Sequence, residues 1–368
     1  MTRYAIVVIG YNRADSISRL LVSLAQGIYS ESVDLLISID NSGTDTVEKC
    51  ATEFEWKFGN KKVFTYPSRL GLRRHILHCG DFLKNYEAIA VFEDDVVPSP
   101  GFFNYMKATV EKYSGDENVA GISLYGIQWN QTVNKPFEPT NAGDDVYFMQ
   151  LAQSWGQIWM RKQWYDFIDW YNTFTDTSFD NANVPPNVRG WPNTSWLKYH
   201  IRYCIERKKY FVYPYVSLTT CFSEVGQNTK QESALLQVSY LASEKKNYKL
   251  PAYEDAIKYD AYMERQLEDV DCDLYGGKEV YQKAKVLSIR PLSYKIISTY
   301  GLLLRPHEMN YINKIPGEII KLYDTTQPCK LSNRTWEMEE FKYRFRVYNQ
   351  ARQMFVYLRQ RLKKKFFK

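Results

Sequence analysis

Short apolar runs alternate with amphipathic segments over the first hundred residues. The runs Tyr4–Ile9, Asp34–Ile39, Lys62–Tyr66 and Ala88–Phe92 are rich in apolar and β-branched residues, as expected of strands buried in a sheet. Between the first two runs, apolar residues recur at helical spacing over 17–24. Strands separated by helices in this way predict right-handed crossovers and a parallel sheet. We therefore expect an α/β fold whose ligands bind beyond the carboxyl ends of the strands.

The rest of the chain has a less regular pattern. From about 100 to 230 it predicts mixed strands and loops, and the polar stretch Thr173–Pro192 predicts a long loop. The strands expected there are Val119–Leu124, Phe148–Ala152, Gln157–Met160 and Tyr210–Val216. From about 231 the pattern is helical and increasingly basic. We therefore expect one domain over 1–230, with two halves that meet near residue 100, and a helical extension over 231–368.

Composition and charge exclude several classes of protein. Of the 368 residues, 45% are hydrophobic and 24% are charged, which indicates a folded globular chain. No apolar stretch reaches the roughly 18 residues of a membrane-spanning helix, and the opening run is too short for a signal peptide, so we expect a cytoplasmic protein. The six cysteines are too far apart to predict a zinc knot or a disulfide framework. The net charge of +6 is concentrated in residues 331–368 rather than spread over a folded face, which disfavours nucleic-acid binding.

An acidic triplet, Glu93-Asp94-Asp95, follows the strand Ala88–Phe92 directly. Adjacent carboxylates repel one another unless a cation or strong hydrogen-bond donors offset their charge. Oxygen ligands suit Mg²⁺ or Mn²⁺, and Mg²⁺ typically takes one or two carboxylates together with substrate phosphates. A solvated acidic turn before a helix is the plain alternative. Asp40 follows the strand Asp34–Ile39 and is expected at the same edge of the sheet.

The segment Val91–Phe103, which contains this triplet, resembles the DxD-like motif of GT-A glycosyltransferases, most closely the Glu-Asp-Asp form of the N-acetylglucosaminyltransferase I type. Over about residues 4–230, three more segments are similar to family 2 and related transferases in the same order. Ile6–Arg13 resembles their opening strand and loop, and Ser38–Gly43 the segment that places an Asp against the nucleotide base. Arg69–Ile76 resembles an Asn-x-Gly-x-x-x-Asn stretch, with Arg69 and His75 in place of the asparagines. A fourth segment, Ser154–Trp159, is similar to the Trp-Gly-rich acceptor side of bacterial polysaccharide transferases.

The resemblance implies a role for each acidic residue. Asp95 would ligate a Mn²⁺ or Mg²⁺ ion that bridges the two phosphates of a nucleotide sugar. Asp94 would accept hydrogen bonds from ribose or donor-sugar hydroxyls, and Asp40 would accept one from the base.

Basic residues near these segments are candidates for the diphosphate. They are Arg13, Arg73 and Arg74, although basic residues on a helix more often face solvent. His75 and His78 share one helical face, but no third metal ligand accompanies them, so we expect packing or hydrogen bonding there.

The resemblance does not supply a catalytic base. The related transferases carry an Asp beside a Trp near the start of an acceptor-side helix, where this chain has Ser195. A serine has no suitable pKa for a general base. Glu224 is the first candidate, because it follows a predicted strand and precedes Gly226–Thr229, which resembles the family's closing substrate loop. Asp180 in the long loop is the second candidate and Asp169 the third, while a surface-loop acid is the plain alternative for Glu224.

The function implied by the resemblance is that of a metal-dependent, inverting glycosyltransferase. It would move a sugar from a nucleoside diphosphate donor, a UDP-sugar foremost, to a glycan of bacterial surface-polysaccharide synthesis. A nucleotidyltransferase that makes nucleotide sugars would need a Gly-rich phosphate loop with a Lys, which Gly10–Arg13 lacks. A non-enzymatic carbohydrate-binding protein would account for the 30 Tyr and 9 Trp, but it leaves the acidic triplet without a purpose.

The end of the chain has an amphipathic helical pattern from Phe341 onward. Its apolar stripe consists of Phe345, Tyr348, Ala351, Phe355, Leu358 and Leu362. Lys and Arg crowd the other faces of this helix. Such a helix can lie in the interface of an anionic membrane, beside a lipid-linked glycan acceptor at the inner face. Packing on the catalytic domain and pairing in a dimer are the alternatives.

Overall fold

The computed structural model describes residues 3–176, 179, 183–222, 224, 233–266, 284–286, 294–328 and 342–346. The chain divides into two compact units. Unit 1 comprises Met1–Gln128 with Asn141–Met263, and unit 2 comprises Trp129–Thr140 with Glu264–Lys368. Unit 1 extends past the expected boundary at 230, because the chain after that point returns to it: Pro251 O, for example, accepts a hydrogen bond from Tyr113 OH at 2.8 Å.

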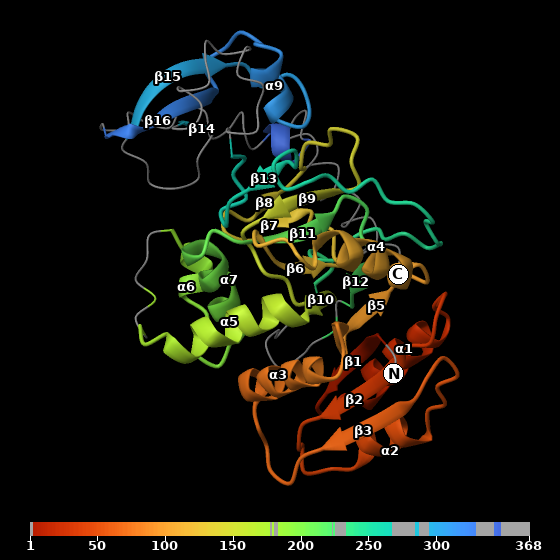
Figure 1. Ribbon diagram of the computed structural model, residues 1–368. Coiled ribbons are helices and arrows are strands. Elements are labelled where there is room, and N and C mark those ends of the chain that lie inside the picture. Colours follow the sequence, from red (N-terminus) through yellow and green to blue (C-terminus); the bar gives the residue numbers. More distant parts are fainter. Residues whose placement is uncertain are drawn as a thin grey trace, which may run out of the picture. The chain divides into compact units, whose positions relative to one another are not determined.

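A nine-stranded sheet forms the centre of unit 1, with strand order β13-β9-β11-β6-β10-β4-β1-β2-β3 (Figure 1). Its strands are β1 (Tyr4–Gly10), β2 (Asp34–Ile39), β3 (Lys61–Thr65), β4 (Ala88–Glu93), β6 (Val119–Ser123), β9 (Val146–Met149), β10 (Gln157–Met160), β11 (Tyr210–Pro214) and β13 (Lys258–Tyr259). Strands β1, β2, β3, β4, β6 and β11 run in one direction, and β9, β10 and β13 run in the other. The predicted α/β fold with a mostly parallel sheet is confirmed.

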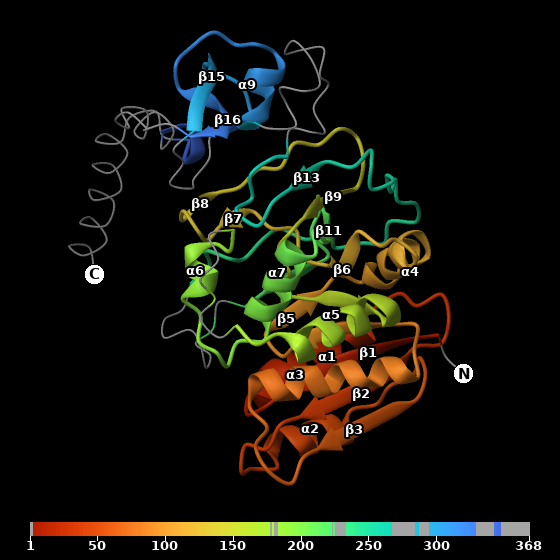
Figure 2. The ribbon, with the colours of Figure 1, turned by 60° about the vertical axis from the view of Figure 1, so that its left-hand side comes forward.

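Helices cover both faces of this sheet (Figure 2). They are α1 (Ala14–Ala25), α2 (Thr46–Glu53), α3 (Leu72–Gly80), α4 (Phe102–Tyr113), α5 (Arg161–Thr173), α6 (Pro186–Arg189) and α7 (Leu197–Glu206), with a 3₁₀ turn, η1 (Asp81–Lys84), after α3. Helices α1, α2 and α4 share a core with the side chains of Tyr4, Ile6 and Val8 on β1. On the other face, α5 packs against α3 so closely that a Cβ on Gly80 would lie 2.1 Å from the Trp164 ring. The sheet is thereby buried on both sides, as its continuous apolar runs predict.

The middle of the chain contains more helix than the sequence pattern predicts. Helices α5 and α7 lie in the region expected to hold strands and loops, and α6 lies within the expected long loop. The prediction overlooks a helical period that is present in the sequence: Trp164, Phe167 and Trp170 recur at helical spacing and pack inward from α5, and Trp196 and Tyr203 pack from the α7 side. Two short strands, β5 (Val96–Pro98) and β12 (Thr219–Cys221), pair antiparallel beyond the end of β4.

Unit 2 contains strands where the sequence pattern predicts helices. Strands β14 (Ala284–Val286), β15 (Tyr294–Tyr300) and β16 (Ile320–Pro328) form an antiparallel sheet in the order β14-β16-β15, and β7 (Trp129–Asn130) pairs with β8 (Lys135–Pro136). The prediction of a helical extension is therefore wrong for 294–328, where α9 (Glu308–Ile312) is the only α-helix among the described residues. The physical reason is that β15 (YKIISTY) is rich in β-branched and aromatic residues, which favour a pleated strand.

The expected C-terminal helix lies almost entirely outside the described residues, which include only 342–346 of it. Within the part of the chain that the structure describes, no helix is long and apolar enough to cross a membrane. Membrane contact of this segment stays a prediction.

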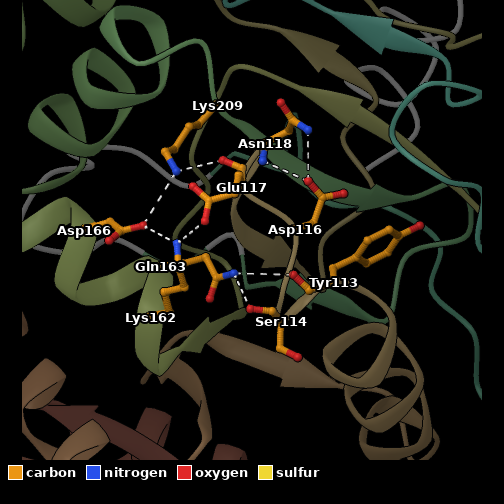
Figure 3. Close-up of polar contacts among 9 residues, drawn as sticks. All are labelled: Tyr113, Ser114, Asp116, Glu117, Asn118, Lys162, Gln163, Asp166 and Lys209. Carbon is orange, nitrogen blue, oxygen red and sulfur yellow. Dashed lines mark hydrogen bonds and ion pairs between the residues drawn. The ribbon is translucent and has the colours of Figure 1, made fainter.

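A polar network closes the edge of the sheet at which β6 and β11 begin (Figure 3). Lys162 and Lys209 lie on either side of Asp166, with Nζ–carboxylate distances of 3.1 and 3.7 Å. Lys162 also contacts the Glu117 carboxylate at 3.0 Å, and Lys209 donates to Glu117 O at 2.7 Å. This network ties α5 to the turn between α4 and β6, and it lies at the edge opposite to the carboxyl ends of the parallel strands.

Candidate functional site

Three segments that carry candidate site residues follow the carboxyl ends of the neighbouring strands β4, β1 and β2. In the parallel ladders, Ile9 of β1 is in register with Glu93 of β4, and Gly10 is in register with Ile39 of β2. The residues that follow are therefore brought together although they are up to about eighty positions apart in sequence. They include Arg13, Asp40 and the triplet that ends at Asp95.

Arg13 is the counter-ion of the triplet. Its guanidinium pairs with both oxygens of Asp94, with Nε at 3.2 Å from Oδ2, and Nη2 lies 3.3 Å from Asp95 Oδ2. Asp94 is buried, whereas Arg13 and Asp95 are partly exposed. A guanidinium that bridges two carboxylates offsets the repulsion between them. The resemblance assigned Arg13 to the diphosphate, and in this structure its nitrogens lie on the acidic residues.

Burial dominates the electrostatics of the triplet. It raises the pKa of Asp94 to about 6, despite the opposing effect of Arg13, and burial with the neighbouring Asp95 and Asp94 carboxylates raises the pKa of Glu93 well above its ordinary value. The same carboxylates raise the pKa of Arg13, which stays charged. Carboxylates with raised pKa values next to a specific charge partner such as Arg13 are typical of functional sites.

Asp95 has the features of a metal ligand. Its Oδ1 is buried and has no hydrogen-bond partner among the described residues. Its backbone is held in place, because Asp95 O accepts a hydrogen bond from Phe222 N at 2.9 Å. No group of three or more His, Cys, Asp or Glu in the described ranges could hold a metal by itself. One carboxylate with a free oxygen fits Mg²⁺ or Mn²⁺ when substrate phosphates supply further ligands.

Asp40 is buried at the end of β2, and its carboxylate holds the loop before α3. Oδ1 accepts hydrogen bonds from Leu70 N at 2.7 Å and from Asn41 N at 2.9 Å, and Oδ2 accepts one from Gly71 N at 2.9 Å. Gly71 has a φ of +78°, which an L side chain rarely adopts. Asp40 therefore has a structural role that the sequence pattern does not reveal, whatever it binds in addition.

His75 forms part of a polar cluster behind Asp40. Its Nε2 lies 2.7 Å from Ser38 Oγ, which is also 3.0 Å from Tyr66 OH. Burial lowers the pKa of His75 to about 4, so the ring is neutral at physiological pH. The expectation that His75 packs and forms hydrogen bonds is confirmed, and His78 on the same helix is exposed.

The other two arginines proposed for the diphosphate differ in their surroundings. Arg73 Nη1 donates to Asn193 O at 2.6 Å and to Tyr199 OH at 2.8 Å, so its guanidinium is directed to the segment before α7. Arg74 is exposed. Arg69, just before α3, lies with its guanidinium carbon 4.9 Å from the centre of the Tyr11 ring.

Glu224 is anchored to α1. Its Oε2 lies 3.2 Å from Ser16 Oγ and pairs with the Arg19 guanidinium, which also lies 4.3 Å from the centre of the Phe222 ring. Ser16 is buried at the start of α1. These contacts hold the end of the β12 segment next to the loop of Asp95. Of the other two candidate bases, Asp169 is exposed on α5, and Asp180 lies outside the described residues.

The Trp155-Gly156 pair lies where β10 begins, beside the end of β4. Gly156 has a φ of +87°, and a Cβ there would lie 2.7 Å from Thr219 Cγ2. Thr219 Oγ1 donates to Trp155 O at 2.6 Å. The half-buried Trp155 ring packs edge-on against Tyr125, with ring centres 4.9 Å apart.

Sequence reasoning missed Arg19 and Tyr66. Arg19 is not one of the buried apolar positions of α1, so the pattern assigns it to the solvent side, and its partners Phe222 and Glu224 are about two hundred positions away. Tyr66 ends the expected third strand, and its hydroxyl contact with Ser38 follows from the pairing of β2 with β3. No local pattern identifies either residue.

No family model and no curated protein matches this sequence. Solved structures similar to the chain include the mannosyltransferase PcManGT from Pyrobaculum calidifontis in complex with GDP-Man and Mn²⁺, at 14% identity and a TM-score of 0.33, over 49% of this chain and 50% of that one. A second is residues 1–349 of S. aureus TarS in complex with UDP, at 14% identity and 0.35, over 54% of each chain. A third is GalNAc-T7 with UDP, GalNAc and Mn²⁺, at 13% identity and 0.38, over 57% of this chain and 41% of that one. The matched regions span about half of these solved chains.

Proposed function

We propose that this chain is a glycosyltransferase that uses a nucleoside diphosphate sugar, a UDP-sugar foremost, together with Mn²⁺ or Mg²⁺. The observation that carries the proposal is the buried, unpartnered Oδ1 of Asp95, beside the Arg13 guanidinium at the carboxyl end of β4. An orphaned carboxylate oxygen and a cation in one place fit a diphosphate–metal complex. The resemblance of the surrounding motifs to GT-A enzymes points to the same chemistry.

The side chains of the site have complementary roles in this proposal. Asp95 would hold the metal ion, which would supply neutralisation of the charge that develops on the departing diphosphate. Arg13 is placed to move from the carboxylates to the phosphates, which would free Asp94 for ribose or sugar hydroxyls. Asp40 keeps the Leu70–Gly71 loop in place. Three backbone amides occupy three of the about four acceptor positions of its carboxylate, which leaves about one position for a base N–H.

For the catalytic base we keep Glu224 as the first candidate and Asp180 as the second. The contacts of Glu224 with Arg19 and Ser16 offer a competing role, that of an anchor for the β12 segment. Two variants separate these roles. If Glu224 is the base, Glu224→Gln lowers kcat about 100-fold or more and Arg19→Met leaves most of the activity. If it is an anchor, both variants lower activity to a similar extent, and Asp180→Asn is the next variant to measure.

Two further parts of the proposal concern the sugar acceptor and the location of the enzyme in the cell. We propose an inverting transfer to a glycan or lipid-linked glycan of bacterial surface-polysaccharide synthesis, at the cytoplasmic face of a membrane. The basic C-terminal sequence supports the location, since residues 331–368 combine many Lys and Arg with aromatic residues.

The test of the function is release of nucleoside diphosphate. The full chain is incubated with Mn²⁺ and a panel of UDP-, GDP- and dTDP-sugars, because transferases often hydrolyse their donor slowly without acceptor. We expect release from one donor class, its loss in Asp95→Asn, and its retention in Asp166→Asn, whose carboxylate lies at the opposite edge of the sheet. Absence of release and of Mn²⁺-dependent nucleotide binding with every donor would contradict the proposal.

A further inference from the structure

Arg13 is an internal cation of the acidic triplet. Its guanidinium pairs with both oxygens of Asp94, and its Nη2 also lies 3.3 Å from Asp95 Oδ2. Among the described residues, no other Lys or Arg forms an ion pair with either carboxylate. A single side chain of the protein itself therefore offsets the charge of these two carboxylates.

The two oxygens of Asp95 have different surroundings. Oδ2 faces the Arg13 guanidinium, whereas Oδ1 is buried and has no hydrogen-bond partner in the described part of the chain. A cation that binds this carboxylate has to share it with the guanidinium as long as Arg13 keeps this position. Because like charges that are partly shielded from water repel one another, the guanidinium weakens the binding of a metal ion to Asp95.

The guanidinium is the member of this group that lies nearest to solvent and is able to move. The Arg13 side chain is 24% exposed, whereas that of Asp94 is 8% exposed. The backbone of Arg13 is fixed at the start of α1, where its carbonyl accepts a hydrogen bond from Ile17 N at 3.1 Å. The side chain can therefore turn about its own single bonds without a change in the fold. A phosphate group offers a guanidinium the same paired hydrogen bonds as a carboxylate does.

We propose that Arg13 couples the binding of the metal ion to the binding of the diphosphate. This inference rests on the proposed function and concerns the regulation of that same site. In the free protein, Arg13 opposes the binding of Mn²⁺ or Mg²⁺ at Asp95. A diphosphate that takes over the guanidinium removes this opposition, and the guanidinium, once displaced from Asp95, is available to the diphosphate. Because such coupling is reciprocal, each ligand raises the affinity for the other by the same factor.

The test measures the binding of Mn²⁺ to the full chain with and without UDP, in the absence of any donor sugar. The electron paramagnetic resonance signal of free Mn²⁺ gives the amount bound. We expect UDP to raise the affinity of the wild type for Mn²⁺ about 100-fold. Arg13→Gln should bind Mn²⁺ alone about tenfold more tightly than the wild type does. In this variant UDP should raise the affinity for Mn²⁺ only about tenfold, because the phosphates still supply metal ligands but no guanidinium has to be displaced.

Arg3→Gln is the matched control. Arg3 directly precedes β1 and also pairs with two carboxylates, those of Glu87 and Glu111, at the opposite end of this strand. Its replacement removes the same charge from the chain and should leave both Mn²⁺ affinities at their wild-type values. Arg13→Lys keeps the charge but loses the planar fork, so it should bind Mn²⁺ alone about threefold more tightly than the wild type. This variant carries the test if thermal melting shows that Arg13→Gln is unfolded.

Two results would overturn this inference and leave the proposed function in place. One is that the wild type and the folded Arg13 variant have the same affinity for Mn²⁺ alone, or respond equally to UDP, although the wild type binds both ligands. The other is that Arg3→Gln changes these affinities as much as the Arg13 variant does, because the effect would then be one of net charge. A wild-type chain that binds Mn²⁺ neither alone nor with UDP would contradict the proposed function, and this inference with it.

Discussion

Replacement of Asp95 by asparagine should make the metal-free protein more stable and the metal-loaded protein inactive. In the wild type, Asp95 leaves one buried oxygen without a partner, and its charge opposes ionisation of Glu93 and Asp94, which contributes to their raised pKa values. A buried unsatisfied group costs about 1–3 kcal/mol. Asparagine keeps the shape and removes the charge, and its carbonyl oxygen can keep the 3.3 Å contact with Arg13. Because the amide still needs a partner, we expect only part of this cost to be recovered, about 1 kcal/mol.

The response to ligand should change in the opposite direction. A ligand that binds only the folded protein at about 100 times its Kd raises the free energy of unfolding by about 2.7 kcal/mol. With Mn²⁺ and UDP present, the wild type should gain about this amount, whereas Asp95→Asn should gain little. Urea denaturation with and without the two ligands measures both effects, provided that the dependence of the unfolding free energy on urea is unchanged.

Asp166→Asn is the control, since it removes a carboxylate from the network of Lys162 and Lys209 at the far edge of the sheet (Figure 3). It should lower stability by less than about 1 kcal/mol and keep the full response to Mn²⁺ and UDP. An Asp95→Asn protein that is less stable than wild type and still responds fully to the ligands would refute the reasoning.

Three further predictions follow from buried or strained groups. Asp40→Asn should lower the free energy of unfolding by about 1–3 kcal/mol and also weaken UDP binding. The reason is that the single amide oxygen of asparagine cannot accept hydrogen bonds in place of both carboxylate oxygens, which hold Leu70 N and Gly71 N. Unchanged urea denaturation would contradict this prediction. His200 is fully buried among aromatic rings, and burial lowers its pKa to about 3. Between pH 6.5 and about 3, the unfolded chain binds a proton at this histidine that the folded chain does not. The free energy of unfolding therefore falls by about 1.4 kcal/mol for each unit by which the pH falls in this range. His200→Phe should remove this contribution, which urea denaturation at several pH values measures. Gly156→Ala should lower the melting temperature more than Gly143→Ala. Both residues have a positive φ, but only at position 156 would the added Cβ clash with Thr219. Equal shifts of the melting temperature would contradict this reasoning.

The amino-acid sequence by itself determined the strands that build the site. The runs that became β1, β2 and β4 are continuous and apolar because these strands are buried on both faces, and this pattern is local. Polar residues at their ends then had to lie at one edge of the sheet, since parallel strands end together. Asp40, Asp94 and Asp95 could be found in this way, as could the buried role of His75.

Only the tertiary structure decided which side chains meet. Arg13 pairs with residues about eighty positions away and Arg19 with one about two hundred away, and no spacing in the sequence records such contacts. The carboxylate of Asp40 holds the Leu70–Gly71 loop because that loop crosses the end of β2. The strands of unit 2 were missed for a related reason: a basic, aromatic-rich sequence is compatible with helix or strand, and pairing of β15 with β16 decides between them. Long-range pairing is a property of the assembled fold, because each contact depends on every loop that brings its two partners together.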